Sequence, residues 1–229
     1  MLTLYYAPDN ASLILRLALE EAGLRYRTVL VDRAARAQKA PEYLALNPAG
    51  QIPTLVTPSG PIAQTGACLL WLCDAHPAAY LGPAPGSAKR GVFLQWLFFL
   101  SNTVHADLNR IFYPDRFVPS ETVGAHHDTM AERLVGHLRI LDDAVRADRE
   151  TFAPPSALAL YLAPLLRWAA LYPVAGRRWL DLTAFPALAC LAADVEMRAA
   201  ARKAAEAEGL GETPFSAPRL PTPPEGSAT

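Results

Sequence analysis

The sequence predicts an α/β domain over residues 1–77, followed by an all-α helical-bundle domain over residues 88–212. Strand-like segments occur between helical segments only in the first third of the chain. A segment rich in proline and glycine, residues 78–87, then reads as a linker, since these residues interrupt regular structure. Beyond it the apolar spacing is helical until a proline-rich tail, residues 213–229. A chain of 229 residues that is 52% hydrophobic can fill the cores of two such domains.

The first domain begins with a βαβ unit. The first segment is apolar and short, the second is helical and stops at Gly23, and the third alternates in polarity. Two more strands joined by a Pro-Ser-Gly-Pro turn predict a hairpin, residues 54–63, with the turn at residues 58–61. The expected order is strand 2–6, helix 13–22, strand 26–31, short helix 41–46, hairpin 54–63 and helix 66–75.

The second domain is helical throughout. Its expected helices are residues 88–113, 120–147, 156–172 and 186–208. The last sixteen residues contain five prolines and cannot form a helix. We expect this tail to be either a disordered end or a strap that lies across the surface.

Composition excludes several kinds of partner. The net charge is -1, so there is no electrostatic case for nucleic acid or an anionic membrane. The apolar run Val92 to Leu100 is interrupted by Gln95 and is too short to span a bilayer. The first residues lack the charged start and apolar stretch of a signal peptide. We therefore expect a cytoplasmic protein.

The three cysteines carry no recognisable ligand or redox pattern. Cys68, Cys73 and Cys190 form no CxxC pair and no zinc spacing. Cys68 and Cys73 fall on an apolar helix, which favours buried structural thiols in a reducing compartment over a redox role.

The segment Asn47-Pro48-Ala49-Gly50-Gln51-Ile52-Pro53-Thr54-Leu55 is the most informative motif. Proline lacks an N–H for a strand, but it fits if the Ile52–Pro53 bond is cis and Pro53 marks where the strand begins. This geometry leaves the N–H and C=O of Ile52 free to pair with an extended peptide. Gln64 and Thr65 then open a helix, whose N-terminal N–H groups can hold a carboxylate. The pattern predicts a site for a small acidic peptide.

These motifs resemble those of the glutathione S-transferase family, which carries an N-P-x-G-x-[IV]-P-x-L segment and then an acidic-Ser pair at a helix start. The resemblance covers residues 2–77 closely and 88 to about 210 by helical pattern only. It implies a thioredoxin-like N-terminal domain, a homodimer, glutathione as co-substrate and no metal. It also implies that glutathione is bound by Gln51, Ile52, Pro53, Gln64 and Thr65.

The chain departs from beta-like relatives where the first strand meets the first helix. Those relatives carry Pro-Gly-Ala-Cys-Ser, whereas this chain carries Pro8-Asp9-Asn10-Ala11-Ser12. Ala11 replaces the cysteine, which excludes mixed-disulfide chemistry. Ser12 is either the donor that stabilises the glutathione thiolate or a plain helix N-cap. Asn10 is the other candidate donor, through its amide N–H, with a loop-forming role as the alternative.

Gln64-Thr65 replaces the acidic-Ser pair of the family. Gln64 can accept a hydrogen bond from the γ-glutamyl ammonium but offers no charge, and charge-assisted bonds are the stronger kind. We expect weaker glutathione binding than in acidic-Ser members, with Thr65 holding the γ-glutamyl carboxylate.

In the second domain, Asn102, His105, Asn109 and Phe112 are spaced to share one face of helix 88–113. His105 lies where beta-like relatives carry a histidine that faces the site, so it could stabilise a developing anion or assist proton transfer. A buried or interface histidine is the alternative.

Three further histidines, His126, His127 and His137, have no carboxylate or cysteine at ligand spacing, so no metal site is predicted. Ser156 can cap the helix that follows it. Ala159, however, cannot return the second bond of the family's capping box.

The resemblance predicts an enzyme that conjugates the glutathione thiolate to a small apolar electrophile, with Ser12 or Asn10 and His105 as catalytic residues. Three departures, at Ala11, Gln64 and Ala159, leave two alternatives open. One is a non-catalytic glutathione-binding or scaffold protein. The other is a glutathione-dependent isomerase or lyase, which would not consume glutathione in a stable conjugate.

Overall fold

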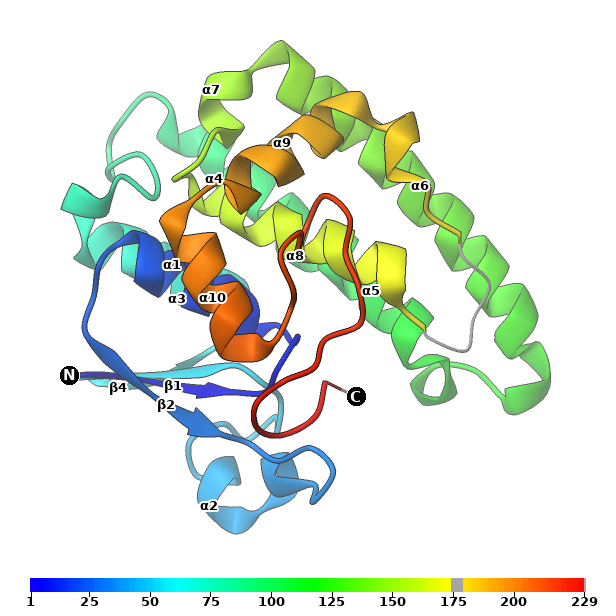
Figure 1. The fold of residues 1–229 in the computed structure, drawn as a ribbon, viewed down its shortest axis with the longest axis horizontal. Helices are drawn as coiled ribbons and strands as arrows, with labels where there is room; N and C mark the ends of the chain where they lie inside the picture. The colour runs from blue at the N-terminus through cyan, green and yellow to red at the C-terminus, as the bar shows by residue number, and fades with distance from the viewer. Residues whose placement is uncertain (174–178, 229) are drawn as a thin grey trace.

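The structure is a computed structural model that describes residues 1–173 and 179–228. Its N-terminal part is a four-stranded sheet in the order β2-β1-β3-β4, in which β1 pairs parallel with β2 and antiparallel with β3. Figure 1 shows α1 and α3 on one face of this sheet and α2 on the other. The elements are β1 (Leu2–Tyr6), α1 (Ser12–Glu21), β2 (Tyr26–Leu30), α2 (Pro41–Leu44), β3 (Thr54–Thr57), β4 (Gly60–Ala63) and α3 (Thr65–Ala75), with a 3₁₀ turn at Ala37–Lys39. The predicted thioredoxin-like α/β domain is confirmed.

Strand β1 shows how the sheet separates its two faces. Successive side chains of a strand point to opposite sides. Tyr6 lies under the Arg16 guanidinium of α1, 4.6 Å from its ring centroid, while Tyr5 meets the ring of Tyr43 in α2 at 5.8 Å. Leu4 is completely buried. The central strand is therefore covered on both faces.

The C-terminal part is helical, as predicted. Its elements are α4 (Arg90–Phe98), the π-helical segment η3 (Phe99–Val104), α5 (His105–Phe112), α6 (Val123–Ala147), α7 (Arg149–Phe152), α8 (Ala157–Leu171), α9 (Pro186–Glu196) and α10 (Ala199–Glu208). Single 3₁₀ turns lie at Pro77–Ala79, Pro114–Arg116, Ser120–Thr122 and Leu182–Ala184. Helix α8 is the centre of this domain, since residues 157–169 are all buried. In the part of the chain that the structure describes, no helix is both long and apolar enough to cross a membrane.

Two predicted helices are wrong in detail. Residues 88–113 do not form one regular helix, because the π-helical segment Phe99–Val104 widens the turn and shifts the register. Asn102 lies inside this segment and is exposed. Residues 186–208 form two helices, because the backbone of Arg198 is extended (φ −72°, ψ 144°) and its guanidinium binds Glu21 of α1.

The start of α8 confirms half of a capping box. The Ser156 hydroxyl accepts the Leu158 N–H at 3.3 Å and donates to the Thr151 carbonyl at 2.9 Å. Ala159 returns no bond, as the sequence predicts. The N-terminus of the central helix is therefore held by one side chain instead of two.

The two domains share one apolar core. Helix α1 packs against α3 within its own domain and against both α8 and α10 of the second. Every residue from Ser12 to Leu19 is buried, so α1 has no solvent face over that stretch. The loop at the start of α1 is consequently fixed by both domains.

The proline-rich tail is a strap, one of the two alternatives expected for it. Figure 1 shows it in red, leaving α10, passing α8 and ending near the sheet. Arg167 of α8 donates to the Pro214 and Arg219 carbonyls at 3.0 and 2.9 Å. The Thr222 N–H donates to the Gly209 carbonyl at 2.8 Å. Only glycine fits at residue 209, because φ is 64° and a Cβ would lie 1.9 Å from the Thr222 oxygen.

Candidate active site

The loop before β3 presents an open backbone edge. The Ile52–Pro53 bond is cis and β3 begins at Thr54, as predicted. Among residues 1–173 and 179–228, nothing hydrogen-bonds to the N–H or C=O of Ile52. The loop is anchored by the Gln51 carbonyl, which accepts Asn47 Nδ2 and the Tyr43 hydroxyl, each at 2.7 Å. An extended peptide can therefore pair with a preformed edge.

Gly50 holds the turn that leads into this edge. Its φ is 59°, in the left-handed region, and a Cβ there would lie 2.8 Å from the Gln38 carbonyl. Both the conformation and the space require glycine.

The N-terminus of α3 offers a second binding feature. The first hydrogen bond of this helix runs from the Cys68 N–H to the Gln64 carbonyl at 3.0 Å, so the preceding N–H groups remain free. Thr65 is buried, with 7% of its surface exposed, and its hydroxyl has no hydrogen-bond partner among the described residues. Gln64 is exposed and has a φ of 70°. The helix start can hold a carboxylate between its N–H groups and the Thr65 hydroxyl.

Ser12 lies in the first turn of α1 and is not its N-cap. Helix α1 starts at Ser12 itself, so its reading as the N-cap is wrong. The side chain is fully buried, donates to the Ala7 carbonyl at 3.0 Å and accepts the Ala7 N–H at 3.2 Å. In this arrangement the hydroxyl closes the loop 7–12 and has no free proton for a ligand sulfur.

Asn10 is better placed as a donor. It is half-buried, and its side-chain amide makes no hydrogen bond to any described residue. Its carbonyl accepts the Leu13 N–H at 2.7 Å, which fixes the backbone at the start of α1. The amide is thus a free donor on a fixed backbone.

Asp9, the residue before Asn10, is held entirely by the second domain. Its carboxylate accepts Arg167 Nε at 2.8 Å and Nη2 at 2.9 Å, Trp168 Nε1 at 2.7 Å and the Tyr172 hydroxyl at 2.9 Å. Neither the Asp9 nor the Arg167 side chain is exposed. Asp9 also has a φ of 47°, which suits the glycine of beta-like relatives.

A second buried carboxyl supports the same loop. Glu208 of α10 accepts the Asp9 N–H at 2.8 Å through one oxygen and Arg16 Nε at 2.7 Å through the other. Burial raises the pKa of Glu208 to about 7, against the opposing pull of the Arg16 guanidinium. Both domains therefore fix the loop from Pro8 to Ser12.

His105 lies close to this network. Its Nδ1 is 3.0 Å from the Tyr161 hydroxyl, and its ring is 5.8 Å from that of Trp168, which itself donates to Asp9. Burial lowers the pKa of His105 to about 4, so the ring is neutral at neutral pH. Its Nε2 has no hydrogen-bond partner among the described residues. The ring can offer one nitrogen to a bound molecule.

Similarity to known proteins identifies the family. Residues 1–73 match the domain family described as "Glutathione S-transferase, N-terminal domain". A sphingomonad glutathione S-transferase, solved in complex with glutathione, is 32% identical over 91% of this chain and 100% of that chain, with a TM-score of 0.77. This chain belongs to the glutathione S-transferase family.

Two curated relatives of this glutathione S-transferase family member extend the likeness. Glutathione S-transferase GstA of Escherichia coli O157:H7 is 28% identical over 72% of this chain and 81% of its own length. Glutathione S-transferase GST-4.5 of Xanthomonas campestris is 27% identical over 90% of this chain and 98% of its own length. The similarity therefore extends well beyond the N-terminal domain.

Two cysteines and two histidines of this family member are held by contacts within the fold. Burial raises the pKa of Cys68 and Cys73 to about 12, so neither thiol is a nucleophile at neutral pH. His137 Nε2 lies 3.1 Å from the buried Asp107 carboxylate, and His126 Nε2 lies 3.3 Å from the Arg110 carbonyl.

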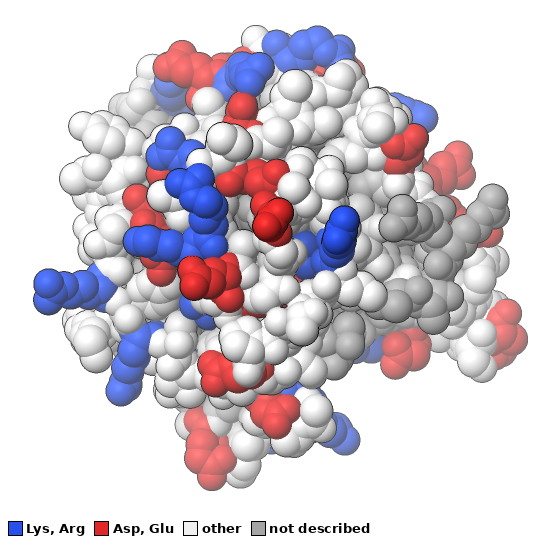
Figure 2. Space-filling view, viewed as in Figure 1, with Lys and Arg blue, Asp and Glu red and all other residues white. Residues whose placement is uncertain are grey.

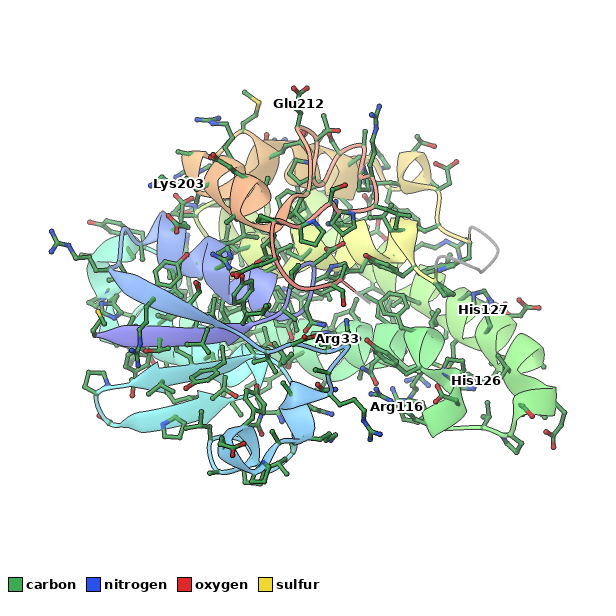
Figure 3. All side chains as sticks on the ribbon, turned by 60° about the horizontal axis from the view of Figure 1, so that its bottom comes forward. Arg33, Arg116, His126, His127, Lys203 and Glu212 are labelled. Atoms are coloured by element: carbon green, nitrogen blue, oxygen red, sulfur yellow. The ribbon has the colours of Figure 1, made fainter. Side chains whose placement is uncertain are left out.

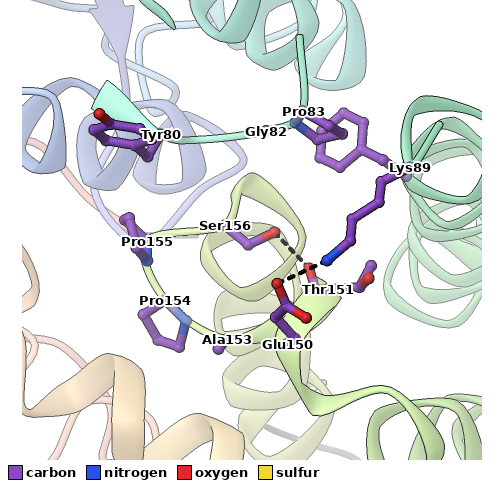
Figure 4. Close-up of a pocket in the computed structure, with 11 residues that line it drawn as sticks. Tyr80, Gly82, Pro83, Lys89, Glu150, Thr151, Ala153, Pro154, Pro155 and Ser156 are labelled. Carbon is purple, nitrogen blue, oxygen red and sulfur yellow. Dashed lines mark hydrogen bonds and ion pairs between the residues drawn. The ribbon is translucent and has the colours of Figure 1, made fainter. Parts of the chain in front are cut away.

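Two pockets among the described residues of this family member are lined by none of these side chains. One, shown in Figure 4, lies between the linker and the start of α8, where Lys89 and Glu150 form an ion pair of 2.7 Å. The other is bounded by Glu20, Glu21 and residues 197–200. The candidate site is thus defined by its free donors and open backbone edge.

Two features of the structure did not follow from the sequence. The first is the buried pair of Asp9 and Arg167. An acidic residue where relatives have glycine is unusual, but its partner Arg167 is 158 positions away in the sequence. Arg33, which contacts Tyr113 and Ala228, had no motif to mark it.

Proposed function

We propose that this family member conjugates the thiolate of glutathione to a small apolar electrophile. The observation that carries the proposal is the free Ile52 edge beside the free N-terminus of α3. The first would pair with the cysteinyl residue, and the second, with Thr65, would hold the γ-glutamyl carboxylate. Gln51 and Pro53 would shape the edge, and Gln64 would accept a bond from the γ-glutamyl ammonium.

Thiol activation would come from Asn10. A free thiol has a pKa near 8.5, so roughly 3% is ionised at pH 7. A decrease of about two units requires about 2.7 kcal/mol of preferential thiolate stabilisation. The unpaired Asn10 amide and the positive end of the α1 dipole supply donors of the required kind. Ser12 would act by holding the loop.

The thiolate would then attack the electrophilic carbon of the co-substrate. A C–S bond forms, and the leaving group departs with the bonding electron pair. Neutral His105 would donate a hydrogen bond from its free nitrogen to the negative charge that develops on the co-substrate. Alignment of the two reactants would supply much of the rate enhancement.

We also propose that the protein is a cytoplasmic homodimer. Val92 and Phe98 of α4 are large apolar side chains that are 45% and 52% exposed, and packing against a second copy would remove them from water. The cysteines are unpaired, in keeping with a reducing compartment. Sedimentation of wild type and Phe98→Glu tests the dimer; a monomeric wild type contradicts it.

Titration calorimetry with glutathione, followed by turnover of chlorodinitrobenzene, tests the function. We expect wild type to bind and Thr65→Val, which keeps the shape without the hydroxyl, to bind about tenfold more weakly. Binding without turnover over a panel of electrophiles would favour the non-catalytic member, for which the occupied Ser12 hydroxyl is the supporting observation. Product analysis separates an isomerase or lyase, which would leave no stable conjugate.

A further inference from the structure

Arg33 lies at the same sheet edge as the loop from Pro8 to Ser12. Strands β1 and β2 are parallel, with Tyr6 beside Leu30, and the Val31 N–H donates to the Tyr6 carbonyl at 2.8 Å. The carboxyl ends of the two strands therefore meet, and the segments that follow them are neighbours. In α/β sheets this edge is where ligands bind. Arg33 follows β2 as Asn10 follows β1.

The Arg33 guanidinium has only neutral partners. Nη2 donates to the Tyr113 hydroxyl at 2.8 Å, and Nη1 donates to the Ala228 carbonyl at 2.6 Å. Across residues 1–173 and 179–228, no carboxylate lies within 4.0 Å of it. A charged acceptor roughly doubles the strength of the bond, so this half-buried arginine would bind an anion more strongly than a neutral oxygen. A carboxylate can therefore replace one of the two neutral acceptors of Arg33.

A second arginine shares the same tyrosine. The Arg116 guanidinium lies 4.0 Å from the ring centroid of Tyr113 and is exposed. It too has no ion pair within the described ranges. Figure 3 shows Arg33 and Arg116 near the end of α5. Two cations with no paired carboxylate thus flank one aromatic side chain.

Two aromatic side chains lie between these cations and the loop from Pro8 to Ser12. The rings of Phe112 and Tyr172 meet edge to face with centroids 5.9 Å apart, and the Tyr172 hydroxyl donates to Asp9. Burial raises the pKa of Tyr172, and the nearby charge of Arg33 opposes that rise. The neighbours of Asn10 and Arg33 are therefore linked by aromatic side chains, because Tyr172 bonds Asp9 and meets Phe112, and Phe112 precedes Tyr113, which bonds Arg33.

We propose that Arg33, assisted by Arg116, binds a carboxylate on the electrophile, whose aromatic body lies along Phe112 and Tyr172. The proposal rests on the transferase function and specifies its substrate class. In the reaction, the thiolate attacks the ring carbon that bears a halogen, the C–S bond forms and halide leaves with its electron pair. The carboxylate is unchanged and displaces the Ala228 carbonyl from Arg33.

Chlorodinitrobenzoate and its methyl ester test the proposal, because the two differ in charge at neutral pH but undergo the same reaction. For each, kcat/KM is divided by the rate constant of the uncatalysed reaction with glutathione. We expect wild type to favour the acid over the ester by about tenfold, the factor that one bond to a charged group typically supplies. No preference for the acid would overturn the proposal.

Variants of Arg33 distinguish binding of the substrate carboxylate from a purely structural role. Arg33→Leu should lower the acid-to-ester ratio about tenfold, Arg116→Leu by a smaller factor, and Arg33→Lys should give an intermediate ratio. Arg139→Leu, which removes an exposed charge on α6, is the matched control and should leave the ratio unchanged. If Arg33→Leu alters acid and ester equally, Arg33 is only a tie between the β2 loop, α5 and the strap.

Binding of the finished conjugates separates this inference from the transferase function. Wild type and Arg33→Leu are titrated with the glutathione conjugate of the acid and with that of the ester. A preference for the acid conjugate that Arg33→Leu removes would support the subsite even without turnover. Turnover of the ester with no acid preference in either assay would leave the transferase function standing and overturn the subsite.

Discussion

Asp9 and Arg167 are joined by two hydrogen bonds, of 2.8 and 2.9 Å, and neither side chain is exposed to solvent. The pair links the loop that precedes α1 to the central helix of the second domain. Arg167 also donates to two carbonyls of the strap, so one guanidinium holds three segments together. The position of Asn10, next to Asp9, is therefore set by the second domain as much as by its own.

Asp9→Asn tests this link. The substitution leaves the Arg167 guanidinium buried without a carboxylate, and breaking a buried pair in this way typically costs about 3–5 kcal/mol. We expect the free energy of unfolding in urea to fall by about that amount. Asp143→Asn breaks an ion pair with Arg146 in which both side chains are exposed, and should cost less than about 1 kcal/mol. Equal losses in the two variants would contradict the importance of the buried pair.

The sequence predicted the first domain well because local rules govern it. The turn at Gly50, the cis bond at Pro53 and the helix start at Thr65 each follow from residues within a short window. The partners of Asp9 and Ser12 did not follow. One bonds a residue 158 positions away, and the other bonds backward across its own loop.

The second domain was predictable only in outline. Helical spacing gave the class of the domain, but the π-helical segment Phe99–Val104 and the break at Arg198 depend on tertiary packing. The contacts of Arg33 could not be predicted for the same reason, since Tyr113 and Ala228 lie in distant parts of the chain.

Gln64→Glu should tighten glutathione binding. Gln64 is exposed at the start of α3, where a carboxylate would meet the γ-glutamyl ammonium, and a charge-assisted bond is roughly twice as strong as a neutral one. We expect the Kd measured by titration to fall about threefold to tenfold at low salt, and less at high salt. Gln95→Glu, on α4, adds the same charge elsewhere and should have no effect. An unchanged Kd for Gln64→Glu counts against this placement.

Asn10→Ala and Ser12→Ala distinguish the two candidate donors. If Asn10 donates to the sulfur, Asn10→Ala should raise the pKa of bound glutathione by about one unit, followed through the ultraviolet absorbance of the thiolate. Ser12→Ala leaves buried backbone groups of Ala7 without a partner, which costs about 1–3 kcal/mol of stability. A thiol pKa that moves with Ser12→Ala and not with Asn10→Ala would reverse the assignment.

The low pKa of His105 predicts a pH-dependent stability. The pKa of His105 is about 4 in the folded protein, below the 6.5 of an unperturbed histidine. As pH falls, this side chain therefore binds a proton in the unfolded chain before it does so in the folded protein. The contribution of His105 is fully present above pH 6.5 and is lost as pH falls toward 4. Between pH 7 and pH 5 we expect a loss of roughly 2 kcal/mol, at about 1.4 kcal/mol per pKa unit.

The measurement is urea unfolding of wild type and His105→Gln at both pH values. The variant lacks the titrating group, so the difference in stability between the two proteins should change with pH by the amount expected for His105. A difference that is the same at pH 5 and pH 7 would mean that His105 titrates normally in the folded state.

Two truncations test whether the strap limits access to the site. The last five residues make three contacts near the site. Glu225 accepts the Tyr6 hydroxyl, and Gly226 lies against Leu30 and Pro8. The Ala228 carbonyl accepts a hydrogen bond from Arg33. Ending the chain at Pro224 removes these contacts but keeps Phe215, which is buried to 1% exposure. We expect the KM for the electrophile to fall, because the strap no longer competes at Arg33, while the thermal midpoint changes little.

Ending the chain at Thr213 should lower the KM and also destabilise the fold. This truncation removes Phe215 from the core and both carbonyls that accept from Arg167. Loss of a buried phenylalanine typically costs about 3–5 kcal/mol, which thermal unfolding would register. Because only the longer truncation disturbs the core, the shorter one isolates the effect on access. A KM that neither truncation alters would show that the strap does not gate the site.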